Sequence, residues 1–230
     1  MTAAEFRIRP EHRWPVAAAI VVALGLYLLL PGAFLPAFRY AIAGVCALAL
    51  VPLIWFNPVR LTRESRASRI ASLALAAVLL LANQLALVQL AHGLLTTRDT
   101  DAPGILLAAV QVWVSNVIAY AIIYWELDRG GPVVRRREAR VSLPPADFRF
   151  PQDEDHDAVA EVASRSSARS DWSPLFFDYL YFSATNGMAF SPTDVMPLSI
   201  RAKALMLAES LSGFAILALV IARAVNVMGG

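Results

Sequence analysis

Long, unbroken apolar blocks dominate this sequence and restrict it to folds that a lipid bilayer can hold. Four of them cover residues 14–30, 36–56, 70–95 and 104–127, and a fifth covers 200–228. Because a helix rises about 1.5 Å per residue, about 20 apolar residues cross a hydrocarbon core of about 30 Å. The bilayer core offers no water to backbone groups, so spanning segments of this kind form helices. We therefore predict an all-α, polytopic membrane helix bundle with five transmembrane helices.

The first two blocks follow a basic stretch, a layout that cleaved signal peptides share. Pro31 and Gly32 lead almost at once into the second block, which favours an uncleaved hairpin of two helices. Asn57 and Pro58 then end the second helix, because proline lacks a backbone N–H and disfavours helical conformation in the residue before it. The single cysteine, Cys46, lies inside an apolar block, which excludes an intrachain disulfide.

Arginine is distributed unevenly among the segments that join the blocks. With the N-terminus inside, thirteen arginines fall in inside segments, and the outside turns hold only Arg98. The inside set is Arg7, Arg9, Arg13, Arg60, Arg63, Arg66, Arg69, Arg129, Arg135, Arg136, Arg137, Arg140 and Arg149. Since basic residues in short loops favour the cytoplasmic side, we expect a multi-pass protein of the plasma membrane. Its N-terminus and residues 128–171 are then cytoplasmic.

Residues 128–171 form a polar stretch that divides the chain into three parts. We interpret it as a solvent-exposed cytoplasmic linker between a four-helix transmembrane region, 1–127, and a C-terminal region, 172–230. His156 lies in an acidic run, but no second histidine or cysteine is close to it, so a solvated charge run is favoured over a metal site.

The sequence gives no positive indication of an enzyme. It contains no Gly-rich phosphate loop, nucleophile elbow or paired metal-ligand motif. We therefore predict a protein that is not an enzyme and has neither cofactor nor metal. The formal net charge of +2 gives no reason to expect a nucleic-acid partner.

The stretch before the last block, residues 174–190, is aromatic and short. It is broken at Asn186–Gly187 and again at Ser191–Pro192. This pattern predicts a half-helix that enters the membrane and turns back, because a broken backbone at membrane depth is tolerated where protein or a water-filled cavity surrounds it. The alternative is a sixth full span, against which the length of the stretch and Asp178 both argue.

Tyr181-Phe182-Ser183, Asp194 and Pro197 stand in an order and spacing that resemble the pore region of two-span potassium channels. The triplet matches the family's pore helix, Asp194 its filter aspartate, and Pro197 the proline that follows, without a gap. The resemblance covers about 55 residues. It implies a pore helix, a re-entrant loop and an inner helix with a hinge at Gly213.

The filter itself departs from the family's pattern, since residues 189–193 replace Thr-Val-Gly-Tyr-Gly. The family's filter points backbone carbonyls at the ion, and its glycines reach conformations that Ser191 and Thr193 reach only at a cost. Pro192 fixes its own φ at about −65°. A potassium-selective carbonyl column is therefore not expected. The predicted orientation differs too, since this loop dips from the cytoplasmic side, as in ionotropic glutamate receptors.

A second resemblance is to bacterial integral membrane proteins of unknown function that share a C-terminal signature. The matching residues are Tyr181, Phe182, Ser183, Gly187, Met188, Phe190, Asp194 and Val195. That family has no established activity, so the resemblance implies no mechanism.

Polar side chains inside the apolar blocks are further candidates. Charges in a bilayer are costly unless they are paired or face a cavity, and Asp178 and Glu209 are the intramembrane charges of the C-terminal region. Tyr124 and Trp125 are expected in an interfacial aromatic belt. Gln111, Ser115, Ile118, Ile122 and Glu126 share one face of the fourth helix, and Asn83, Gln84, Gln89 and His92 lie on the third. For the amides we expect interhelical hydrogen bonds.

Two functional hypotheses follow. In the first, the chain forms a homo-oligomer such as a tetramer, through which an ion or small solute passes. Its constriction residues are Asn186, Gly187, Ser191, Pro192, Thr193 and Asp194, and Glu209 sets cation preference. In the second, the chain is a non-conducting membrane scaffold or accessory subunit. A monomeric carrier is disfavoured because the sequence has no internal repeat.

Overall fold

The structure is a computed structural model. It describes residues 11–30, 40, 44, 66–96, 102–154, 159–167, 172–188 and 194–228. In that part of the chain, three helices are long and apolar enough to cross a membrane: Arg69–Leu94, Leu106–Gly130 and Ile200–Val225. The first block forms a shorter apolar helix, and the second block lies outside the described residues apart from Tyr40 and Gly44. The helical membrane architecture is thus supported, and five spans remain a prediction.

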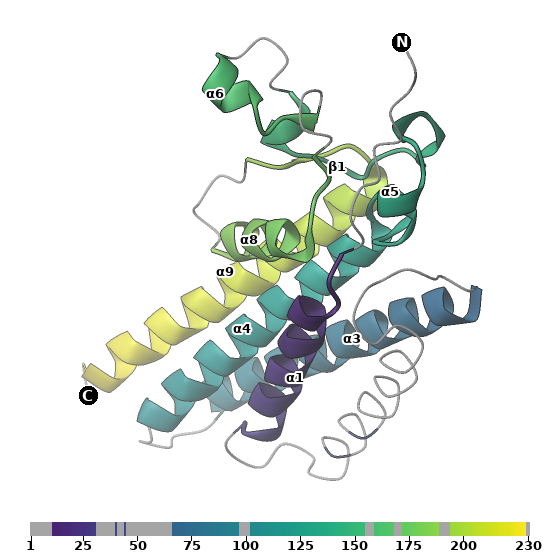
Figure 1. The fold of residues 1–230 in the computed structure, drawn as a ribbon. Coiled ribbons are helices and arrows are strands. Elements are labelled where there is room, and N and C mark those ends of the chain that lie inside the picture. The colour runs from purple at the N-terminus through teal and green to yellow at the C-terminus, as the bar shows by residue number, and fades with distance from the viewer. Residues whose placement is uncertain are drawn as a thin grey trace, which may run out of the picture.

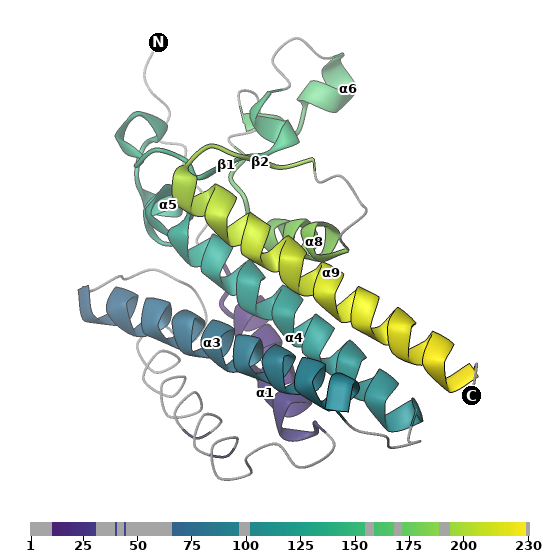
Figure 2. The same ribbon diagram turned by 180° about the vertical axis from the view of Figure 1, so that it is seen from behind.

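Helices dominate the described chain. The elements are α1 (Trp14–Leu28), α3 (Arg66–Thr96), α4 (Ala102–Leu127), η1 (Asp128–Gly130), α5 (Val134–Arg137), η2 (Arg140–Ser142), β1 (Phe148–Arg149), η3 (Pro151–Asp153), α6 (Ala160–Ala163), α8 (Phe176–Gly187), β2 (Met196–Pro197) and α9 (Ile200–Met228). α4 is central and contacts α1, α3, α8 and α9, as Figure 1 and Figure 2 show from opposite sides.

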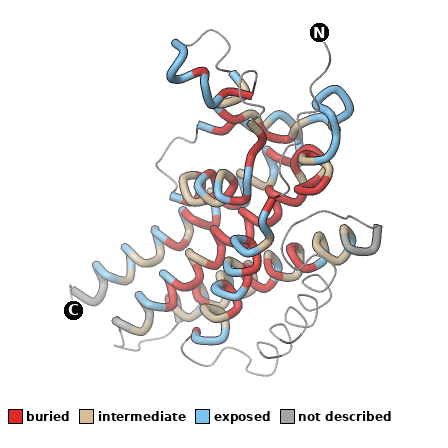
Figure 3. Tube along the Cα trace, in the orientation of Figure 1, coloured by how far each residue is buried: buried red, intermediate tan, exposed pale blue. Residues whose placement is uncertain are grey.

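The central place of α4 follows from its sequence. Within its candidate span 72% of the residues are buried, against 33% in α3 and 22% in α9, and its tube is mostly red in Figure 3. Small alanines let neighbouring backbones approach closely. The predicted polar face is confirmed as an inward face, since all five of its residues are buried: Gln111, Ser115, Ile118, Ile122 and Glu126.

The predicted aromatic belt on α4 is wrong. Tyr124 and Trp125 are 0% and 3% exposed, because α8 covers this end of α4. Phe182 stacks on Tyr124 with ring centroids 4.8 Å apart, and Phe176 meets Trp125 edge-on at 6.0 Å. Both aromatic residues are therefore core residues.

The prediction of a solvent-exposed linker is wrong for several residues of its described part. Asp128, Arg135, Phe148 and Phe150 are all buried. β1 pairs antiparallel with β2, which places Phe148 opposite Pro197. Phe148 also lies edge-on to Tyr124 and Phe182, with ring centroids 5.0 Å away in each case. This stretch closes the end of the bundle where α4 ends and α9 begins; His156 lies outside the described residues.

Candidate functional site

The start of α8 is tied down by carboxylates. The first N–H groups of a helix lack partners within the helix, and here Asp178 Oδ2 accepts from the Leu175 N–H at 2.7 Å, while Glu11 Oε1 accepts from the Phe176 N–H at 2.7 Å. Asp178, a predicted intramembrane charge, is therefore a helix-capping residue in this structure.

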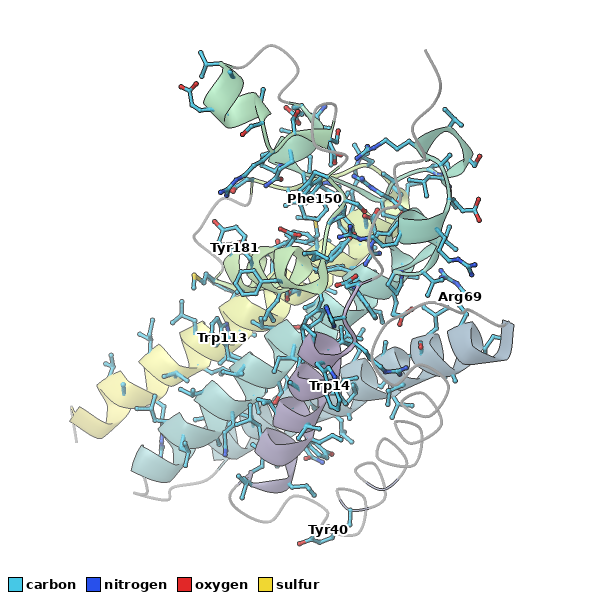
Figure 4. The ribbon with its side chains drawn as sticks, viewed as in Figure 1. Trp14, Tyr40, Arg69, Trp113, Phe150 and Tyr181 are labelled. Carbon is cyan, nitrogen blue, oxygen red and sulfur yellow. The ribbon has the colours of Figure 1, made fainter. Side chains whose placement is uncertain are left out.

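The other end of α8 lies against α4 and α9 at very short range. The Trp113 indole N–H donates to the Gly187 carbonyl at 3.2 Å. A Cβ on Gly213 would clash with that same carbonyl oxygen, so this contact requires glycine in α9. α9 runs unbroken through Gly213, and the hinge that the channel resemblance implies at this position stays a prediction. Trp113 and Phe150 approach α8 from opposite sides (Figure 4).

Both flanks of α8 are fixed at one end of the bundle. Ahead of α8, three consecutive carbonyls accept hydrogen bonds from arginines: Trp172 from Arg140, Ser173 from Arg136 and Pro174 from Arg135. After α8, β2 pairs with β1 directly before α9 begins. Gly187, by contrast, meets α9 at Gly213, midway along the candidate span Ile200–Val225.

Glu209 forms the centre of a polar cluster between α4, α8 and α9. Its side chain is 0% exposed. Oε2 accepts from the Tyr124 hydroxyl at 2.7 Å and from Asn186 Nδ2 at 2.6 Å, and Oε1 is hydrogen-bonded to Ser183 Oγ. All three partners are neutral. We name Glu209, Tyr124, Ser183 and Asn186 the Glu209 cluster.

Two of the predicted constriction residues, Asn186 and Gly187, lie close to Glu209. In this structure both pack between helices of the chain. Asn186 Nδ2 also donates to the Met206 carbonyl at 3.1 Å, and its Oδ1 accepts from Ser210 Oγ at 3.1 Å. Asn186 is thus buried between two helices of one chain. Asp194 is exposed just before β2. The remaining predicted constriction residues, Ser191, Pro192 and Thr193, lie outside the described residues.

The third and fourth blocks share a second polar contact, as predicted for their amides. Asn83 and Gln84 both donate to Asn116 Oδ1, at 2.7 and 3.2 Å. Ser212 of α9 donates to Gln84 Oε1 at 3.2 Å. Asn116, which is fully buried, is a partner that was not predicted from the sequence. The available signal was simple, since an asparagine within an apolar block needs an interhelical partner.

Arg135 is the largest fully buried side chain of the described residues. It donates to the carbonyls of Trp125 at 2.7 Å, Pro174 at 3.2 Å and Asp128 at 3.3 Å. Its guanidinium lies over the Tyr179 ring, 5.0 Å from the centroid, a favourable cation–π arrangement. Arg135 therefore joins the end of α4 to the start of α8.

Buried carboxylates surround this arginine. Asp128 accepts from the Tyr179 hydroxyl at 2.5 Å and from the Asp147 N–H at 2.8 Å. Glu11 Oε2 accepts from the Trp125 indole at 3.1 Å and lies 3.9 Å from Arg135. We name Arg135, Asp128 and Glu11 the end cluster. From the sequence, Arg135 is expected to be one of several exposed linker cations, and its burial corrects that expectation.

Two openings lie beside these clusters. An open apolar groove of about 280 Å³ lies where α8 ends, between α4 and α9, lined among others by Val110, Trp113, Met188 and Ile216. A second hollow of about 280 Å³ is lined by Arg129, Arg140, Arg149 and Asp153 among others. Among the described residues, no group of three or more His, Cys, Asp or Glu side chains could hold a metal ion.

Comparisons with protein-family models, curated proteins and solved structures return no match.

Proposed function

We propose that the chain is a multi-pass membrane protein in which α8 is a re-entrant half-helix. It dips from the cytoplasmic side to about the middle of the membrane, and the chain then returns to the same side. One observation carries this proposal: both flanks of α8 are held where α4 ends and α9 begins, whereas Gly187 meets Gly213 midway along α9. Non-spanning backbone at such depth needs protein around it, and α4 and α9 supply it.

The function that this geometry supports best is that of a subunit in an oligomeric pore-loop protein that passes a small cation. The C-terminal end of a helix carries partial negative charge, so α8 favours a cation near the level of Gly187. One half-helix cannot enclose a pore, and closed symmetric rings are a common form of homo-oligomer. In this proposal Glu209 anchors α8, because its carboxyl is fully buried. It does not line the path.

A second candidate is a non-conducting membrane scaffold or accessory subunit. One observation favours it: Ser183 and Asn186 both find their hydrogen-bond partners within one chain. α8 can therefore be an element of helix packing that needs no ligand.

The first experiment tests the path of the chain. In a Cys46→Ala background, single cysteines are placed at Leu175, which is 43% exposed, and at the exposed Asp194. Val141, which is 96% exposed, provides the reference position for that side. We expect all three to react with a membrane-impermeant thiol reagent from the same face. Labelling of the Leu175 and Asp194 positions from opposite faces would sink the re-entrant proposal.

The second experiment separates the two functions. Purified protein is reconstituted in liposomes, and tracer cation flux is measured for wild type and Asp194→Asn, with Arg137→Gln as a control at another exposed position. A pore predicts flux that changes in Asp194→Asn and stays unchanged in the control. Tight vesicles containing folded protein, or a strict monomer in detergent, would instead support the scaffold.

A further inference from the structure

Ser183 Oγ makes two close contacts with oxygen atoms, but it has a single hydrogen to donate. If the Glu209 carboxyl is ionised, neither of the two contacted oxygens supplies a second hydrogen. Ser183 Oγ lies 2.7 Å from the Val117 carbonyl oxygen and is also hydrogen-bonded to Glu209 Oε1. A hydroxyl carries one hydrogen, and a carbonyl carries none. Each contact has a hydrogen of its own only when Glu209 supplies one from Oε1 to Ser183, which in turn donates to Val117; otherwise the two acceptors share the single Ser183 hydrogen.

The other carboxyl oxygen agrees with this assignment. Glu209 Oε2 accepts from Tyr124 and Asn186, so the acid proton belongs on Oε1. Among the described residues, the titratable groups that face the carboxyl are Tyr120 and Tyr124 of α4. The groups that α8 presents, Ser183 and Asn186, do not ionise, and α3 presents Gln84, also neutral, through Ser212. An ionised Glu209 would thus be a buried charge with no cation beside it among the described residues, which is costly.

We propose that the Glu209 carboxyl, the Ser183 hydroxyl and the Val117 carbonyl form an intramembrane proton-binding site. With the proton bound, the three groups form a directed chain from acid to hydroxyl to carbonyl. When the proton leaves, the Ser183 hydrogen turns to Glu209, and Ser183 Oγ then faces the Val117 oxygen at 2.7 Å with no hydrogen between them. The repulsion and the uncompensated charge loosen α8 from α4.

This inference deepens the proposed function by giving α8 a proton-dependent attachment, and it rests on the membrane location of α9. It does not require that the protein conducts. A protein that conducts nothing can still bind this proton, and a conducting protein can lack it. A measurement on the carboxyl itself therefore separates the two proposals.

The first test is infrared spectroscopy of the protein in lipid bilayers at neutral pH. A protonated carboxylic acid has a carbonyl stretch distinct from that of a carboxylate. We expect Glu209→Gln to lose one such band per chain. Glu126→Gln, which changes a different buried glutamate that lies on α4, should keep the band. Ser183→Ala should keep the band at a shifted frequency, because the acid loses its acceptor. An unchanged spectrum in Glu209→Gln would overturn the proposal.

The second test follows the attachment of α8 by amide hydrogen exchange as the pH is raised. In wild type, we expect faster exchange toward the C-terminal end of α8 at high pH. Glu209→Gln imitates the neutral acid and should remove this pH dependence. If Glu209→Gln fails to fold, Tyr124→Phe serves as the second variant. It keeps the Glu209 acid and removes one donor to Oε2, so its exchange should still depend on pH. Equal pH dependence in wild type and Glu209→Gln would overturn the coupling to α8.

Discussion

The end cluster and the Glu209 cluster both attach α8 to α4, but they deal with buried carboxyl groups in opposite ways. In the end cluster, the Glu11 carboxylate lies 3.9 Å from the Arg135 guanidinium, and the Asp128 carboxylate lies 3.5 Å from the guanidinium of the neighbouring Arg129. In the Glu209 cluster, the partners of the carboxyl within the described part of the chain are hydroxyl and amide groups. A long arginine near a membrane surface can keep its charge, whereas deeper positions favour neutral partners. The start of α8 is thus attached by charged groups, and its end by hydrogen bonds between Glu209 and neutral groups.

The largest expected effect lies in the end cluster. Arg135→Ala removes the guanidinium 3.9 Å from Glu11 and the hydrogen-bond donor of three carbonyls. Breaking a buried ion pair on one side costs about 3–5 kcal/mol, and we expect a loss of that size in the free energy of unfolding, measured by denaturant titration in detergent. Arg137→Ala, at an exposed position, should stay within about 0.5 kcal/mol of wild type. A small loss for Arg135→Ala would mean that charge does not attach the start of α8.

The next effect tests the close helix contact beside the Glu209 cluster. In Gly213→Ala, the new methyl group would clash with the Gly187 carbonyl oxygen, and overpacking of this kind costs about 1–3 kcal/mol. Gly93→Ala on α3 is the matched control, because nothing lies within 4 Å of its added Cβ. Alanine is the better helix former by about 1 kcal/mol, so the control should be neutral or more stable. Equal effects in the two variants would contradict the close contact.

The sequence predicted those features whose physical cause is local. The inward face of α4 follows from the helical spacing of residues such as Gln111 and Glu126, and both are buried. The predicted break at Asn186–Gly187 lies at the C-terminal end of α8. The paired amides Asn83 and Gln84 were expected to bond between helices, because polar groups in apolar surroundings need partners.

What the sequence could not give was the choice of partners across long separations. Tyr124 has an aromatic belt's position on α4, yet it is buried because Phe182, far along the chain, stacks on it. Arg135 stands in a run of arginines that looks uniformly solvated, and only the fold separates it from exposed Arg137. Asn186 and Glu209 were both named as candidates. Their pairing depends on how α8 packs against α9.

A smaller effect is expected from one donor within the Glu209 cluster. Tyr124→Phe removes the hydroxyl that donates to Glu209 at 2.7 Å and keeps the ring stacked on Phe182. Interhelical hydrogen bonds in membrane proteins contribute about 0.6 kcal/mol on average and at most about 1.7. We expect a loss in this range in the same unfolding titration. The control is Tyr181→Phe, because Tyr181 on the outer side of α8 is 53% exposed, and this variant should have no measurable effect. A loss above about 3 kcal/mol, as in one-sided breaking of an ion pair, would mean that Glu209 is ionised and that the two clusters do not differ.

The smallest effect is expected where an ion pair meets water. Arg149 and Glu154 approach to 2.5 Å, but their side chains are 42% and 46% exposed, and exposed pairs contribute about 0–1 kcal/mol. Arg149→Ala should therefore cost no more than that, and less at high salt, because screening acts on exposed charges. The cost of Arg135→Ala should hardly respond to salt, since that guanidinium is buried. If salt weakened both effects equally, water would have to reach Arg135. The charge of Arg135 at the start of α8 would then be exposed to solvent in the same way as that of Arg149.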